Sequence, residues 1–144
     1  MADAVDRLNG FLRGEISAVE TYNQVMEKAE CESMMKTLSL CQTDHAKRVQ
    51  LLKKRIEELG GVPAEDSGVW GAIARLLEGG AAAFGQKAAI DMLEEGEDHG
   101  IESYRCEMFK LDPENLRLVE TQLLPAQEQT HRAIRDLKHT AFAA

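Results

Sequence analysis

Aromatic residues are scarce in this sequence, at 5% of its 144 residues, and Val, Ile and Thr are few beside Leu, Ala, Glu and Lys. Strands favour aromatic and β-branched residues, whereas helices favour the four types that are abundant here. A chain of this length fits one domain with a hydrophobic core of ordinary size. The composition therefore predicts a single all-α domain over residues 1–144.

Cysteines and long apolar runs are also lacking. The sequence has three scattered cysteines, Cys31, Cys41 and Cys106, which form neither a CxxC pair nor a disulfide framework. This favours a reducing compartment, and we expect a cytoplasmic protein. The polar N-terminus has no apolar signal core. We expect no membrane-spanning segment, because the most apolar region, residues 69–90, is interrupted by Arg75, Glu78, Gln86 and Lys87.

Positive charge is in deficit, since the formal net charge is −8 and no Lys/Arg cluster offsets it. Nucleic acids and anionic lipid surfaces bind basic patches, so we expect neither as a partner. An acidic chain can still attract cations, which bears on the polar residues described below.

What the sequence does contain is apolar residues at spacings of three and four, the pattern of helices packed in a bundle. We predict main helices over residues of about 3–30, 33–59, 86–111 and 113–139, and a further helix over about 68–83. Gly60 and Gly61 end the second main helix, and Asp112 and Pro113 begin the fourth. Pro125 should kink or split that fourth helix.

The connection between the second and third main helices is much longer than the other two. Residues 60–85 can carry the chain along the whole bundle, so the third helix need not be antiparallel to the second. A four-helix bundle of two hairpins joined by one long, partly helical crossover is therefore the predicted architecture.

A short internal repeat relates the two hairpins. Residues 15–22 align with residues 97–104, with three identities: Glu15 with Glu97, Glu20 with Glu102, and Tyr22 with Tyr104. The tetrapeptides at 42–45 and 128–131 also align, and each ends in a histidine. The order of the matching residues is the same in both halves, which supports the reading of two related hairpins.

Each main helix has an ionisable residue on its inner face: Glu15, His45, Glu97 and His131. In each hairpin the Glu and the His are equally far from the turn, so they should face each other at the same height. Glu128 lies three residues before His131 and can point the same way. Buried charges must be paired or bound to a metal, and carboxylates with imidazoles in a bundle core suit a divalent cation.

These residues, with Tyr22 and Tyr104, resemble the ligand pattern of ferritin-like proteins. The stretches LNGFLRGEISAVETY, GGVPAEDSGVWGAIARLLEGGA and LEEGEDHGIESY resemble, more narrowly, an uncharacterised bacterial family of ferritin-like four-helix bundles, over nearly the whole chain. The resemblance implies a di-iron or mononuclear carboxylate and histidine site that reacts with oxygen or peroxide. Iron is the expected metal, with manganese or zinc as the alternatives. The second helix departs from the di-iron pattern, because Gln42 stands where a Glu is usual; Glu94 offers a further carboxylate.

Two functional readings stay open at this point. In the first, Glu15, His45, Glu97, Glu128 and His131 bind a metal, and Gln42, Glu94, Tyr22 and Tyr104 support them. In the second, the same helices form a non-enzymatic structural or stress-related protein whose buried Glu–His network is free of metal and fixes helix register. The sequence leaves open whether the chain forms a homo-oligomer.

Overall fold

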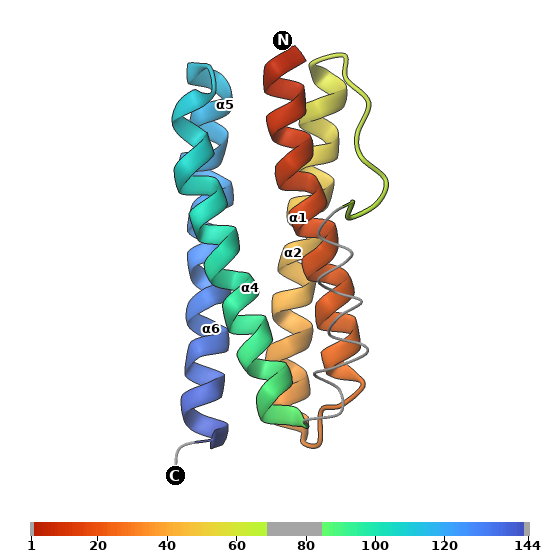
Figure 1. The fold of residues 1–144 in the computed structure, drawn as a ribbon, viewed down its shortest axis with the longest axis vertical. Helices are drawn as coiled ribbons and strands as arrows, with labels where there is room; N and C mark the ends of the chain where they lie inside the picture. The colour runs from red at the N-terminus through yellow and green to blue at the C-terminus, as the bar shows by residue number, and fades with distance from the viewer. Residues whose placement is uncertain (1, 69–84, 143–144) are drawn as a thin grey trace.

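The computed structural model describes residues 2–68 and 85–142, and within them every regular element is helical (Figure 1). The longest helices are α1 (Ala2–Met26), α2 (Glu32–Glu58), α4 (Gln86–Glu107) and α6 (Leu124–Phe142). Three short elements join the last two: a 3-10 turn (Met108–Lys110), α5 (Pro113–Leu118) and a π-helical turn (Val119–Leu123). The predicted all-helical bundle is confirmed, whereas all but the first residue of the helix expected over 68–83 lies outside the described residues.

The helices pack as two antiparallel hairpins, α1 with α2 and α4 with α6 (Figure 1). Helix α2 ends at the upper end of the bundle in this view, and α4 begins at the lower end. The two ends of the connection therefore lie at opposite ends of the bundle, and α2 and α4 run in the same direction. Across the bundle α1 packs on α4, and α2 packs on α6.

The end of α2 follows the predicted glycine stop. Gly60 has a φ of +80°, a conformation that glycine adopts without steric cost, and the Gly61 N–H donates back to the Ile56 carbonyl at 2.9 Å. A Cβ on Gly61 would lie 2.6 Å from a methyl group of Val5. The glycine pair thus ends the helix and lets the following chain lie close against α1.

The fourth main helix, for which the sequence predicted a kink or a split at Pro125, consists of α5, the π-helical turn and α6 in direct succession. Pro125 is the second residue of α6, directly after the π-helical turn and Leu124. Proline lacks an N–H and is tolerated in the first turn of a helical segment. The irregular turn therefore lies where the sequence placed the disturbance.

The apolar core consists of two clusters with a polar layer between them. One cluster is built around Leu8, Leu12, Leu52 and Leu123, and the other around Val25, Leu38, Leu93 and Ile134. On each main helix buried polar residues fall between the two clusters in sequence: Glu15 and Ser17, His45 and Arg48, Glu97, and Gln127 and Thr130. The polar layer therefore crosses all four helices at one level of the bundle.

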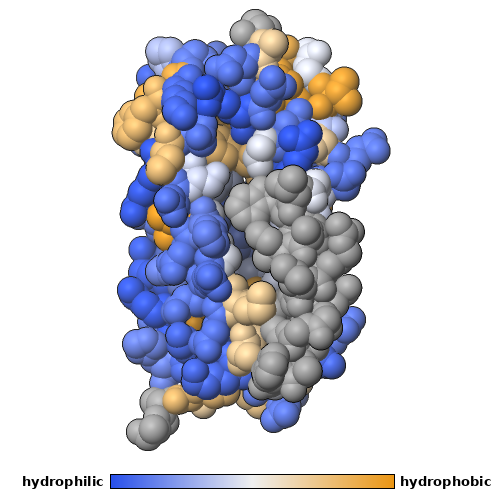
Figure 2. All heavy atoms as spheres, in the orientation of Figure 1, coloured by the Kyte–Doolittle hydropathy of each residue, from blue (hydrophilic) through white to orange (hydrophobic). Residues whose placement is uncertain are grey.

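The outer faces are polar, as expected for helices that bury one stripe. Figure 2 shows a mostly hydrophilic surface on the side of the bundle that faces the viewer. No helix among the described residues is long and apolar enough to cross a membrane.

Candidate functional site

His45 lies at the centre of the polar layer, between two glutamates from different helices. Its Nδ1 is 2.8 Å from Glu15 Oε2 on α1, and its Nε2 is 2.6 Å from Glu97 Oε1 on α4. All three side chains are at most 5% exposed. Because both ring nitrogens face carboxylate oxygens, this geometry suits an imidazolium that donates two hydrogen bonds.

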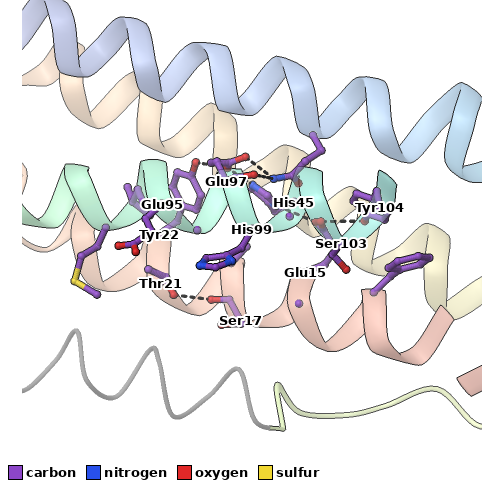
Figure 3. Close-up of a pocket in the computed structure, with 18 of the residues that line it drawn as sticks. Glu15, Ser17, Thr21, Tyr22, His45, Glu95, Glu97, His99, Ser103 and Tyr104 are labelled. Atoms are coloured by element: carbon purple, nitrogen blue, oxygen red, sulfur yellow. Dashed lines mark hydrogen bonds and ion pairs between the residues drawn. The ribbon is translucent and has the colours of Figure 1, made fainter. Parts of the chain in front are cut away.

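Two tyrosines join the glutamates in a crosswise pattern (Figure 3). Tyr22 on α1 donates to Glu97 Oε1 at 2.7 Å, and Tyr104 on α4 donates to Glu15 Oε1 at 3.1 Å. In each copy of the sequence repeat, the tyrosine thus donates to the glutamate of the other copy. The internal repeat therefore appears in space as a reciprocal exchange of hydrogen bonds between α1 and α4.

Arg48, one turn after His45, is a second buried cation in the polar layer. Its side chain is 3% exposed, and its Nη1 donates to Glu15 Oε1 at 3.3 Å and to the amide oxygen of Gln127. Its Nη2 donates to Thr130 Oγ1 at 2.9 Å and to Asp44 Oδ2, also at 2.9 Å. Arg48 therefore links α1, α2 and α6.

The α6 contribution comes from Gln127 and Thr130, which the sequence analysis did not single out. Gln127 Nε2 donates to both Glu97 Oε2 and the Glu97 backbone carbonyl, at 2.8 and 2.9 Å. Thr130 Oγ1 lies 2.7 Å from the same carboxylate oxygen. A signal was present in the sequence, because Gln127 and Thr130 continue the apolar stripe of Val119, Leu123 and Ile134 at spacings of three and four.

Glu128 and His131 differ from expectation, since the structure places neither in this cluster. Glu128 pairs with Arg105 at 3.0 Å, and His131 pairs with Asp98 at 2.5 Å. Each lies one residue after an inward residue, which is about 100° around an α-helix. The two side chains lie at nearly the level of the bundle that the repeat predicted. They point, however, towards the outer face of α4 and α6.

The two other residues considered as ligands are occupied elsewhere. Gln42 Nε2 donates to the Val19 carbonyl at 3.0 Å, and Glu94 pairs with Lys138 at 3.2 Å. These contacts join α2 to α1 and α4 to α6, so both residues act as links between neighbouring helices.

Charge and burial shift the ionisation of the central groups. Burial alone lowers the pKa of His45, but the charges of Glu15 and Glu97 outweigh it and raise the pKa to about 9. Burial raises the pKa of Glu97, and the facing His45 more than compensates, so the pKa of Glu97 lies below its ordinary value. Burial and the neighbouring glutamates raise the pKa of Tyr22 and of Tyr104 well above the ordinary range. At neutral pH the site therefore contains an imidazolium, a Glu97 carboxylate and neutral phenols.

The donor set does not fit a metal ion as it is arranged. The two glutamates bind opposite nitrogens of one imidazole ring, so the ring itself occupies the space between them. Glu15 Oε1 and both carboxylate oxygens of Glu97 also receive hydrogen bonds from tyrosine, arginine, glutamine or threonine. Within residues 2–68 and 85–142, no three His, Cys, Asp or Glu side chains are grouped as metal ligands.

A cavity of about 230 Å³ lies beside the polar layer, between α1 and α4. Its lining includes Gly10 and Ala18 of α1 and Gly96 of α4, which form its walls. Glu15 and Tyr22, labelled in Figure 3, belong to its polar floor. The small wall residues leave this space open because they have little or no side chain to fill it.

Comparison with known protein families identifies one that matches most of the chain. The match covers residues 3–108, and the family is described as a domain of unknown function, DUF2383. The chain belongs to the DUF2383 family. Comparisons with curated proteins and with solved structures find no match.

The DUF2383 match includes much of the polar site but not all of it. Glu15, Tyr22, His45, Glu97 and Tyr104 lie inside the matched residues. The α6 partners come after residue 108. The repeated glutamates and tyrosines on α1 and α4 therefore lie within the DUF2383 region.

Proposed function

We propose that this chain is a non-enzymatic four-helix bundle whose buried network around His45 fixes the pairing of its helices without a metal. One observation carries the proposal: the central charges balance among themselves. Glu15 and Glu97 supply two negative charges, and His45 and Arg48 supply two positive charges. In such a network each buried charge is paired with an opposite charge, which charged groups in a protein core require.

The hydrogen bonds of the network support the same proposal. Both ring nitrogens of His45 and both hydroxyls of the tyrosines are engaged. Of the buried polar atoms of the network, only Arg48 Nε lacks a partner. A satisfied polar layer disfavours shifted helix registers, because any slip would leave buried charges without partners.

The test is thermal melting of protein purified without an affinity tag, with and without EDTA. We expect the same melting temperature in both conditions and substoichiometric metal by elemental analysis, since ligands that bind only the folded state raise its stability. His45→Gln should lower the stability by about 3–5 kcal/mol, the usual cost of removing one partner from a buried ion pair. His139→Gln is the matched control, because His139 is exposed.

The second candidate is a ferritin-like metal-binding bundle, as the order of the sequence motifs suggests. The specific observation in its favour is that two carboxylates and an imidazole meet in the core beside a cavity. Glu15, His45 and Glu97 would be the ligands, and His45 would have to lose a proton and turn its ring. Stoichiometric ferrous, manganese or zinc ion that raises the melting temperature, and that Glu97→Gln abolishes, would establish this candidate and overturn the first.

A further inference from the structure

We propose that the cavity between α1 and α4 binds a small organic ammonium ion that has a short hydrocarbon body. This goes beyond the function proposed above, which concerns only the network at the cavity floor. Four properties of the cavity lead to this ligand: its room, its glycines, its hydrogen-bonding groups and its charge.

The cavity has room for a ligand of several heavy atoms. Its volume of about 230 Å³ is several times the roughly 30 Å³ that one water molecule occupies in the liquid. Gly10, Gly96 and His99 of its lining are exposed, so a ligand can enter from solvent. An accessible space of this size beside a satisfied polar layer therefore suits a site that a ligand fills.

Gly10 and Gly96 keep the cavity open without a structural need for glycine. Both lie inside regular helices, neither has a positive φ, and a Cβ built on either would meet nothing within 4 Å. Glycine inside a helix costs roughly 0.5–1 kcal/mol relative to alanine. Two glycines with this cost in stability, one on each wall, are better explained by the space they leave for a ligand than by the packing of the helices.

The hydrogen-bonding groups at the floor call for a donor on the ligand. The donors of Tyr22, Tyr104, His45 and Gln127 are directed at the glutamates. Among the described residues Glu15 Oε2 bonds only to His45, although a carboxylate oxygen can accept two bonds. The floor thus offers an acceptor, and the side chains of Phe11 and Leu93 offer apolar wall for a hydrocarbon chain.

The charge around the cavity selects a cation. No Lys or Arg side chain occurs among the described residues that line it, whereas Glu95 lies among the exposed lining residues. The net charge of the whole chain is −8. The three lining carboxylates, Glu15, Glu95 and Glu97, outnumber the one lining imidazolium, His45, so an ammonium group fits this surface better than an anion does.

The test uses three probes of one size: n-butylammonium, n-butanol and n-butyrate. Each is titrated into the full chain and followed by amide NMR shifts. We expect saturable shifts with butylammonium, centred on Ala18, Gly96 and Ser103, at least tenfold weaker binding of butanol, and none of butyrate. No saturable binding of butylammonium, or equal binding of butyrate, would overturn the proposal.

Gly96→Leu is the variant that separates this proposal from the one above. The added side chain should fill the cavity without touching the network, so butylammonium binding is lost while the melting temperature is kept or raised. Lys47→Leu, at an exposed position on α2, is the matched control and should bind as the wild type does. Binding that survives in a folded Gly96→Leu protein would place the ligand elsewhere and contradict the assignment.

Discussion

His45 donates from its two ring nitrogens to two buried carboxylates, so its proton is linked to folding. Its pKa rises from 6.5 to about 9 in the folded chain. A group whose pKa is raised by folding stabilises the folded state fully below its unfolded pKa, and that stability is lost as the pH rises through the folded value. We expect the free energy of unfolding to fall by on the order of 2–3 kcal/mol between pH 6.5 and pH 9, as measured by urea denaturation.

The histidine variants provide the control for this prediction. His45→Gln should be less stable throughout and should lose the slope between pH 6.5 and pH 9, whereas His139→Gln should keep it. An identical slope in wild type and His45→Gln would assign the pH dependence to another group and contradict the account.

At the residue scale the sequence predicted the centre of the site and missed its periphery. Glu15 was predicted to face His45, and Glu97 to face His131, because each pair lies equally far from its turn. Glu15, His45 and Glu97 do meet, whereas His131 pairs with Asp98. Arg48 was missed, although it follows His45 by one turn, because arginine on a helix usually faces solvent. Only the tertiary structure shows that Glu15 and Gln127 accept hydrogen bonds from the buried guanidinium and so stabilise its charge.

At the element scale, two glycines of α4 that lie one turn apart should respond oppositely to alanine. A Cβ on Gly100 would lie 2.3 Å from Gln127 Nε2, which two hydrogen bonds to Glu97 hold in place. A Cβ on Gly96 would meet nothing within 4 Å. We expect Gly100→Ala to destabilise by about 1–3 kcal/mol and Gly96→Ala to stabilise by about 0.5–1 kcal/mol.

Chemical denaturation of the two variants side by side measures this difference. Both substitutions raise helix propensity equally, so the contrast isolates the contact with Gln127. Equal effects of the two alanines would show that Gln127 is not seated against Gly100.

The π-helical turn sets the direction of the α6 side chains. Asn115, Val119, Leu123 and Gln127 are all buried and are spaced by four residues, a spacing that drifts around a regular helix of 3.6 residues per turn. The π turn takes up the extra residue and keeps the stripe facing the core. Glu128 and His131 therefore stay on the outer side, which the repeat alone did not reveal.

Removal of the exposed Glu120 tests this role of the turn. The deletion would leave Val119 and Leu123 three residues apart, so a regular helix could keep Gln127 and Thr130 in place. We expect the free energy of unfolding to change by less than about 1 kcal/mol, since exposed positions contribute little. Circular dichroism during urea denaturation provides the measurement.

Deletion of Lys47 is the matched comparison, because it removes an exposed residue from the regular helix α2. It would rotate Arg48 away from His45 by about 100° and should cost at least about 3–5 kcal/mol through the broken ion pairs. Equal losses in the two deletion variants would contradict the idea that the π turn holds a removable residue.

At the scale of the whole molecule, the polar layer divides the apolar core at one level of the bundle. The all-helical architecture could be predicted from composition and spacing, because both depend on local chemistry that the sequence shows directly. The length of the connection indicated that it crosses the bundle, and the directions of α2 and α4 agree with that. The facing of the fourth helix could not be predicted from the repeat, because it depends on a backbone irregularity without a fixed sequence signature.

The central claim is that His45 is a doubly protonated ring held by two glutamates and not a metal ligand. The most direct test records the ¹⁵N chemical shifts of its ring at pH 7, before and after one equivalent of zinc ion. The account predicts protons on both nitrogens and no change with zinc. A bare nitrogen at pH 7, or a nitrogen that takes a coordination shift with zinc in wild type but not in Glu97→Gln, would contradict it.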